Sequence, residues 1–460
     1  MFCTIYEFRA NLTIFVSLRL YISVWNILSS DVKVFFRDDK VKMKKNILKI
    51  VPLFLILFTQ TINAQVELHD SARLSLLTAS PWHGVVYALF GHTAIRVQDD
   101  SVGVDAVFNY GYFDPSQPNF MYNFVRGKTD YVLGVTTFNE FMYEYDYKGQ
   151  QVTEQLLNLT ATEKQQLFNA LYINSLPENI RYRYNYFYDN CATRPRDMIE
   201  EYVNGTINYQ PTSKSQSFRD LLHECLKDHK WTKFGVDLMI GSSADKEIDV
   251  REKMFIPDYL MESFNGATMV VSDTLSYPLV LKSDVILELN SERNSPGEQT
   301  IFTPFVVAFA LLLLSIIISL LQVANLKNVR PAKVYDTLLF GAAGIGGMVL
   351  FTLMYFSEHP ATNPNWNFVW LNIFSLVAAI LFWVNSAKKI VYSYHFINFA
   401  VITIFILLWW LIPQQLPIAT IPFSFSLLVR SGTNLFMMRN KKIKNSRFTS
   451  SRHMKAGWGQ

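Results

Sequence analysis

The sequence predicts an α+β domain followed by an all-α bundle of transmembrane helices. Residues 65–300 mix alternating strand-like runs with capped helices, whereas long apolar stretches fill the last third of the chain. Half of all residues are apolar or aromatic and only 17% are charged. This balance indicates a soluble part joined to a membrane part.

The N-terminal 64 residues resemble processing signals. Met43 begins a charged segment, and an apolar run covers residues 47–58, as in a secretory signal peptide. Such a signal lies at a true N-terminus, so we interpret residues 1–42 as a spurious extension and residues 43–64 as the signal peptide. The alternative is a first membrane segment over residues 12–27, which an arginine inside it disfavours.

Five apolar stretches predict five transmembrane helices within residues 301–438. Each is about long enough to cross a bilayer. They cover residues 304–321, 337–356, 368–384, 397–412 and 416–437. The last contains Pro417, Pro422 and Arg430, so it is the candidate for a short or kinked span.

Positive charge predicts the orientation of this bundle. Basic residues lie in two of its loops: Lys327, Arg330 and Lys333 in one, Lys388 and Lys389 in the other. Basic loops remain cytoplasmic, so the bundle begins outside and ends inside. This predicts a multi-pass bacterial inner-membrane protein with residues 65–300 in the periplasm and a basic cytoplasmic tail over residues 439–460. The net charge of +4 does not imply nucleic acid.

Residues 65–300 begin with a predicted hairpin. Residues 93–97 and 105–110 alternate in polarity around a turn at residues 99–101. Further strand-like runs follow at residues 120–125 and 131–135.

Three helices are predicted after these strands. Thr160 and the glutamate three residues later form a capping box that begins a helix ending near Asn174. A second helix begins after Cys191 and ends near Gly205. A third covers residues 218–226.

Cys191 is the strongest candidate for a reactive residue. It lies where an irregular aromatic stretch turns into a helix, a position that lowers the pKa of a thiol. Three residues are available as the helix N-cap: Asp189, Asn190 and Thr193. Arg194 and Arg196 would favour the thiolate further if their side chains turn toward the sulfur. The alternative is a small, buried structural cysteine.

The remaining cysteines offer two other kinds of chemistry. Cys3 lies in the suspected extension, so Cys191 and Cys225 are the pair available for a disulfide; the context of Cys191 favours a free thiol. His223, Cys225 and His229 are close in sequence, but their spacing fits no common metal-ligand pattern on one helix face. We therefore predict no metal and no other cofactor.

His92 is the candidate base and acid for the thiol, because it opens the first hairpin strand. A hairpin centred near Ser101 places Asn109 or Tyr110 opposite His92, and we choose Asn109 to orient the imidazole. Asn109 is equally suited to satisfying backbone groups at a strand end. His83 is the alternative histidine.

A polar cluster lies in the loop between the second and third apolar stretches. It contains His359 and Asn367, which are candidates for binding substrate at the membrane surface. The other reading, which we favour, is a polar loop with an interfacial tryptophan, Trp366.

With these residues the chain resembles a bacterial family of lipoprotein N-acyltransferases, which join an N-terminal periplasmic domain to a five-span domain. Residues 90–97, 108–111 and 186–194 carry the resemblance, which covers the chain from about Gln65 onward. The N-terminal half is further similar to the circularly permuted papain-like domain of lecithin:retinol acyltransferase relatives and NlpC/P60 hydrolases. There, as here, a strand histidine precedes a helix-start cysteine.

The resemblance implies a cysteine-dependent acyltransferase. Cys191 would take an acyl chain from a membrane phospholipid as a thioester while His92 moves the proton. The acceptor would be the α-amino group of a diacylglyceryl-cysteine at the N-terminus of a lipoprotein. Three residues of the matching segments are expected to contact substrate: Tyr110, Tyr188 and Arg194.

Two other functions compete. A membrane-anchored thiol hydrolase, either a peptidoglycan amidase or endopeptidase or a phospholipase, would use the same residues. A non-catalytic envelope scaffold would not need Cys191. Five spans favour lipid substrates, because a cell-wall hydrolase needs one anchor at most.

Overall fold

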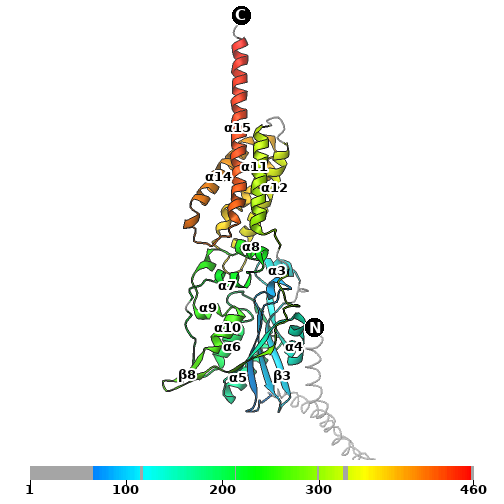
Figure 1. Cartoon of the computed structure of the whole chain (residues 1–460), viewed down its shortest axis with the longest axis vertical. Helices are drawn as coiled ribbons and strands as arrows, with labels where there is room; N and C mark the ends of the chain where they lie inside the picture. The colour runs from blue at the N-terminus through cyan, green and yellow to red at the C-terminus, as the bar shows by residue number, and fades with distance from the viewer. Residues whose placement is uncertain (1–65, 114–117, 213, 298–299, 325–329, 457–460) are drawn as a thin grey trace, which may run out of the picture.

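The computed structural model describes residues 66–113, 118–212, 214–297, 300–324 and 330–456, with side chains as far as residue 440. The predicted extension, residues 1–42, and signal peptide, residues 43–64, lie outside the described residues. An N-terminal domain of antiparallel sheets and helices is stacked on a C-terminal helical bundle along the long axis (Figure 1). The predicted fold class is therefore confirmed.

The N-terminal domain is built on a seven-stranded sheet with the order β10-β5-β1-β2-β3-β4-β6, in which all neighbours are antiparallel. Its strands are β1 (Arg73–Ala79), β2 (His92–Asp99), β3 (Val104–Tyr112), β4 (Asp130–Thr137), β5 (Val152–Leu157), β6 (Arg181–Arg183) and β10 (Val280–Leu287). The predicted hairpin is confirmed as β2 and β3, and the run at residues 131–135 lies within β4.

Helices cover both faces of this sheet. The larger core places α5 (Ala161–Asn174), α6 (Thr193–Tyr202) and α10 (Pro257–Asn265) against apolar side chains of β1, β2 and β3. On the opposite face α4 (Phe138–Lys148) packs through Phe141 and Tyr145. The predicted capping box is confirmed, because Thr160 and Glu163 each accept the other's backbone N–H.

Two predicted elements differ from the structure. Residues 120–125 form a short helix, α3 (Phe120–Val125), rather than a strand. Asn119 adopts the left-handed conformation that leads into this helix, and the apolar side chains lie on the surface instead of joining the sheet. Helix α6 ends at Tyr202, before Gly205.

The rest of the N-terminal domain links the sheet to the bundle. It comprises η1 (Val86–Ala88), β7 (Thr206–Asn208), α7 (Phe218–Cys225), α8 (Lys230–Met239), η2 (Ser242–Asp245), α9 (Val250–Lys253), β8 (Thr268–Ser272) and β9 (Leu275–Pro278). Strands β7, β8 and β9 form a second, three-stranded sheet. Helices α3 and α8 lie at the end of the domain nearest the bundle (Figure 1).

Each predicted apolar stretch overlaps a helix of the bundle: α11 (Pro304–Ala324), α12 (Arg330–Phe356), α13 (Ile373–Leu381), α14 (Lys388–Leu407) and α15 (Thr420–Ala456). The short helices η3 (Trp366–Val369), η4 (Asn385–Ala387) and η5 (Trp409–Leu411) connect them. Among the described residues, three helices are long and apolar enough to cross a membrane: Pro304–Ala324, Arg330–Phe356 and Asn385–Leu407. Lys327 lies outside the described residues.

The third and the fifth predicted spans differ from their predicted lengths, for different reasons. Helix α13 has only nine residues, because η3 and a loop take up the start of the predicted stretch. Helix α15 has 37 residues and is longer than predicted. Pro422 lies in its first turn, where no backbone N–H is needed, so it does not shorten the helix.

Candidate active site

Asn190 shapes the helix start that carries Cys191. Its side-chain Oδ1 accepts the backbone N–H groups of Ala192 (2.8 Å) and Thr193 (2.9 Å). Its Nδ2 donates to the carbonyls of Tyr186 and Phe255. Of the three available caps, the chain therefore uses Asn190, and its four hydrogen bonds hold Cys191 one residue before the helical turn.

Cys191 lies where β2 begins and β3 ends. Its sulfur lies close to the backbone N–H of Thr93, the residue after His92, which partly offsets the rise in the thiol pKa caused by burial. A Cβ added to Gly111, at the end of β3, would lie 3.3 Å from the Cβ of Cys191. The fold thus brings Cys191 close to the start of the strand that carries His92.

The hairpin register differs from the predicted one by about one residue. Ile95 pairs with Phe108, so His92 would fall opposite Gly111 if the ladder continued. Asn109 lies diagonally beside His92, and its interaction with the imidazole partly opposes the lowering of the His92 pKa by burial. Its Nδ2 donates to Thr136 of β4 (3.3 Å), and its buried Oδ1 has no hydrogen-bond partner of ordinary geometry.

Burial decides the protonation of both reactive groups. It raises the pKa of the Cys191 thiol to about 11 and lowers that of His92 to about 4. The imidazole also stacks on the buried ring of Tyr145, with 6.3 Å between the ring centroids. At neutral pH the site therefore holds a neutral thiol and a neutral imidazole.

Burial disfavours the thiolate that the helix start predicted, and the two arginines that could have supported it pair elsewhere. Arg194 pairs with Asp189 (2.5 Å) and lies over the ring of Tyr182 (4.0 Å). Arg196 pairs with Asp197 (2.7 Å). With both charges neutralised by carboxylates, the desolvation of the thiol outweighs the effect of the helix start.

Two family models match this chain. Residues 58–224 match the Lnb N-terminal periplasmic domain, and residues 296–442 match the Lnb transmembrane domain. The chain belongs to the Lnb family. None of the curated proteins or solved structures compared with it matches. The family describes a periplasmic domain anchored in a membrane, with a role related to lipoproteins.

The three residues of the Lnb periplasmic domain that were predicted to contact substrate differ in burial and in partners. Tyr110 is buried in the core of the sheet, and its hydroxyl accepts the side-chain amide of Asn174 (3.0 Å). Tyr188 is exposed and packs edge-on against Phe218. Arg194 is held by Asp189.

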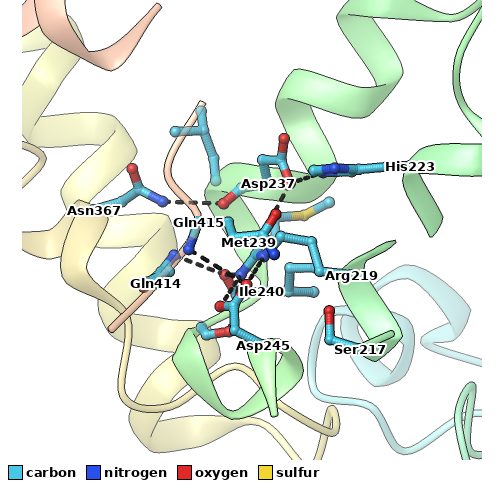
Figure 2. A network of polar contacts seen from close by, with 12 residues as sticks. Ser217, Arg219, His223, Asp237, Met239, Ile240, Asp245, Asn367, Gln414 and Gln415 are labelled. Atoms are coloured by element: carbon cyan, nitrogen blue, oxygen red, sulfur yellow. Dashed lines mark hydrogen bonds and ion pairs between the residues drawn. The ribbon is translucent and has the colours of Figure 1, made fainter. Parts of the chain in front are cut away.

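Asn367 and His359 instead join the two Lnb domains. The buried Asn367 donates to the backbone carbonyl of Asp237, near the C-terminus of α8 (3.0 Å; Figure 2). His359 donates through Nε2 to the carbonyl of Phe124 in α3 (2.7 Å). Both contacts join the bundle to the N-terminal domain.

The competing thiol and histidines have other partners. Cys191 and Cys225 are both free, as expected. His223 bonds Asp237 (2.7 Å), while His83 bonds and stacks on His229. His83 therefore contacts a different histidine at a separate place in the fold.

We did not predict from the sequence that several tyrosines surround Cys191. Five tyrosines lie near enough to Cys191 for a charge on its sulfur to raise their pKa further: Tyr131, Tyr145, Tyr182, Tyr184 and Tyr186. Burial raises the pKa of each, so their hydroxyls stay protonated at neutral pH. The signal was present as alternating tyrosines over residues 182–188.

Proposed function

We propose that this Lnb protein is a lipoprotein N-acyltransferase that moves an acyl chain from a membrane phospholipid through a Cys191 thioester. The acceptor is the α-amino group of a diacylglyceryl-cysteine lipoprotein N-terminus. The observation that carries this proposal is the close approach of Cys191 to Gly111, the position that the hairpin register places opposite His92. Asn109 orients the imidazole.

The first half-reaction begins from the neutral pair. As the sulfur attacks the ester carbonyl, the thiol proton passes to His92, which is unprotonated at neutral pH. The ester C–O bond then breaks, and the leaving alkoxide takes the proton from His92. The products are the Cys191 thioester and a lysophospholipid.

The second half-reaction reverses these proton transfers. The lipoprotein amine attacks the thioester carbonyl, and His92 accepts a proton from the nitrogen. The C–S bond breaks, and His92 returns the proton to the sulfur. The backbone N–H of Cys191 lies at the helix start, where it is suited to stabilising the carbonyl oxygen in both steps.

Lipid substrates are supported by where the site lies in the molecule. Asp130, at the start of β4, pairs with Arg183 (2.7 Å), which pairs with Glu358 of the bundle (3.1 Å). The start of β4 lies beside the end of β3, where Gly111 contacts Cys191. The thiol therefore lies at the strand ends that face the bundle.

The orientation we propose is a bacterial inner-membrane protein with its C-terminus in the cytoplasm. Arg330 and Lys333 lie at one end of α12, opposite the end that adjoins the N-terminal domain. Lys388 and Lys389 begin α14 and lie at the same end of the bundle. Basic residues thus favour the cytoplasmic side for the far end of the bundle.

The deciding experiment is mass spectrometry of a lipoprotein N-terminal peptide from cells that depend on this protein. Wild type and Cys225→Ala should yield the triacylated peptide, whereas Cys191→Ala and His92→Ala should leave it diacylated. A triacylated peptide with Cys191→Ala would reject the proposal. Diacylated peptide in all strains, with muropeptides cleaved or fatty acid released, would support the hydrolase.

The thioester step has its own test. Wild-type protein incubated with phospholipid should gain one acyl mass on the peptide containing Cys191. The same mass on the Cys225 peptide alone would contradict the assignment of the nucleophile.

A further inference from the structure

Helix α3 presents an apolar surface that nothing in the N-terminal domain covers. None of its six residues is buried, and Met121 and Tyr122 are 69% and 62% exposed. The exposed Tyr87 of η1 continues this surface, because its ring packs edge-on against Phe113 (5.3 Å), which stacks on Phe120 (5.9 Å). So many adjacent exposed apolar side chains are typical of an interaction surface.

Hydrogen bonds join α3 to the end of the bundle that adjoins the N-terminal domain. The α3 carbonyl of Phe124 accepts His359 Nε2, and the carbonyl of Arg126 accepts the backbone N–H of Glu358 (2.8 Å). Glu358 also pairs with Lys128 (2.9 Å). Glu358 and His359 follow α12 directly, so α3 lies where that membrane helix leaves the bilayer.

Aromatic residues mark the same level on the bundle itself. Tyr355 and Phe356, the last residues of α12, are largely exposed, as is Trp410 in the segment after α14. Such a belt is typical of the boundary between a bilayer and water. Helix α3 therefore lies at the same level of the bundle as these aromatic residues.

We propose that α3 and η1 insert into the outer leaflet of the bilayer that the bundle spans, and that a phospholipid acyl chain enters the site there. This inference rests on the proposed function for its substrate. The occupant is a glycerophospholipid of that leaflet, because α3 is fixed beside the bundle at the belt.

A line of rings leads from this surface to the thiol. Phe113 contacts Tyr131 (5.7 Å between centroids), and Tyr131 stacks on Tyr184 (4.1 Å). Tyr184 and Cys191 both lie against Gly111. These rings are uncharged and only partly buried, so an acyl chain can follow them from α3 to Cys191 without burying a charge.

Photocrosslinking tests the lipid contact without requiring catalysis. Benzoylphenylalanine replaces Met121 in full-length Cys191→Ala protein, reconstituted in vesicles of phosphatidylethanolamine and phosphatidylglycerol. The control position is Val102, which is 45% exposed at the hairpin turn, the far end of β2 from His92. We expect at least about tenfold more phospholipid adduct from position 121. Equal yields would overturn the inference, even if acyl transfer is confirmed.

A kinetic comparison tests the entry route. Met121→Asp should slow Cys191 thioester formation from vesicle phospholipid by about tenfold or more, because a carboxylate resists insertion. The same variant should react at the wild-type rate with a water-soluble short-chain thioester, and Val102→Asp should be normal with both. An equal loss with both donors would overturn the route, whereas no thioester with any protein would reject the proposed function instead.

Discussion

Burial, rather than nearby charge, sets the chemistry of Cys191 and His92. The thiol has a raised pKa and the imidazole a lowered one, so neither is charged at rest. A neutral pair suits the proposed acyl transfer, because a permanent ion pair would be costly beside an apolar substrate. In the proposed mechanism the thiolate forms only as His92 takes the proton.

The raised thiol pKa predicts the pH dependence of alkylation. Between pH 6 and 10, iodoacetamide should modify Cys191 about tenfold faster per pH unit, because the thiolate fraction rises until about pH 11. Mass spectrometry of the Cys191 peptide measures this rate. A plateau between pH 5 and 8 that disappears in His92→Ala would instead indicate a thiolate–imidazolium pair.

Gly111 is the residue on which the contact with Cys191 depends. It has φ +99°, and an added Cβ would meet the Cys191 Cβ at 3.3 Å. Gly111→Ala should cost about 1–3 kcal/mol through backbone strain and also displace the thiol. Thioester formation should therefore fall further than stability alone explains.

Gly103→Ala is the matched control for that contact. Gly103 has φ +71° in the hairpin turn, with no atom within 4 Å of an added Cβ. It should lower the melting temperature to a similar extent but keep the rate of thioester formation. Equal rates in the two variants would show that the Gly111 contact is irrelevant.

Among the helices, a buried ion pair joins α11, α12 and α15. Arg430 of α15 donates to both carboxylate oxygens of Asp336 in α12 (2.6 and 2.9 Å). It also donates to Ser319 and Gln322 of α11. The arginine that made the last apolar stretch look doubtful is therefore part of the packing of the bundle.

Removing one partner of this pair should destabilise the bundle. Arg430→Leu leaves Asp336 buried without its partner, at a cost of about 3–5 kcal/mol. Thermal unfolding in detergent should show a lower midpoint. The double variant Arg430→Leu with Asp336→Leu should recover much of the loss, and a double variant as unstable as the single one would contradict this account.

At the scale of the whole molecule, side chains of the bundle cap the C-terminal end of α8, a helix of the N-terminal domain. The last carbonyls of α8 have no partners within the helix. They accept side-chain amides of the bundle: Asn367 on Asp237, Asn365 on Leu238 and Met239, and Gln414 on Ile240. Figure 2 shows the contacts of Asn367 and Gln414 beside the buried Arg219, which pairs with Asp237 and Asp245.

Loss of these caps should loosen the two domains from each other. In Asn365→Ala with Asn367→Ala, we expect faster hydrogen exchange in α8 and a fall in thioester formation from vesicle phospholipid. Alkylation of Cys191 should stay unchanged, because the site itself is intact. Gln415→Ala, which removes an exposed bond to Asp220 (3.1 Å), is the control and should have little effect. Unchanged exchange in the double variant would contradict the capping role.

Local patterns in the sequence predicted much of this molecule. Hydropathy located the helices of the bundle, alternation located the β2–β3 hairpin, and the capping box located α5, because each signal depends on neighbouring residues alone. The order of His92 and Cys191, and the helix start at Cys191, were also readable. Their catalytic roles stay predictions.

Only the tertiary structure decided what surrounds those residues. Burial raises the pKa of Cys191, which we expected to be lowered. Arg194 pairs with Asp189 instead of approaching the sulfur, and Tyr110 is buried in the core. Residues 120–125 form a surface helix that meets the end of the bundle through His359 at Phe124, with Glu358 bonded to the following Arg126. Desolvation and ion pairing depend on segments far apart in the chain, so local sequence does not determine them.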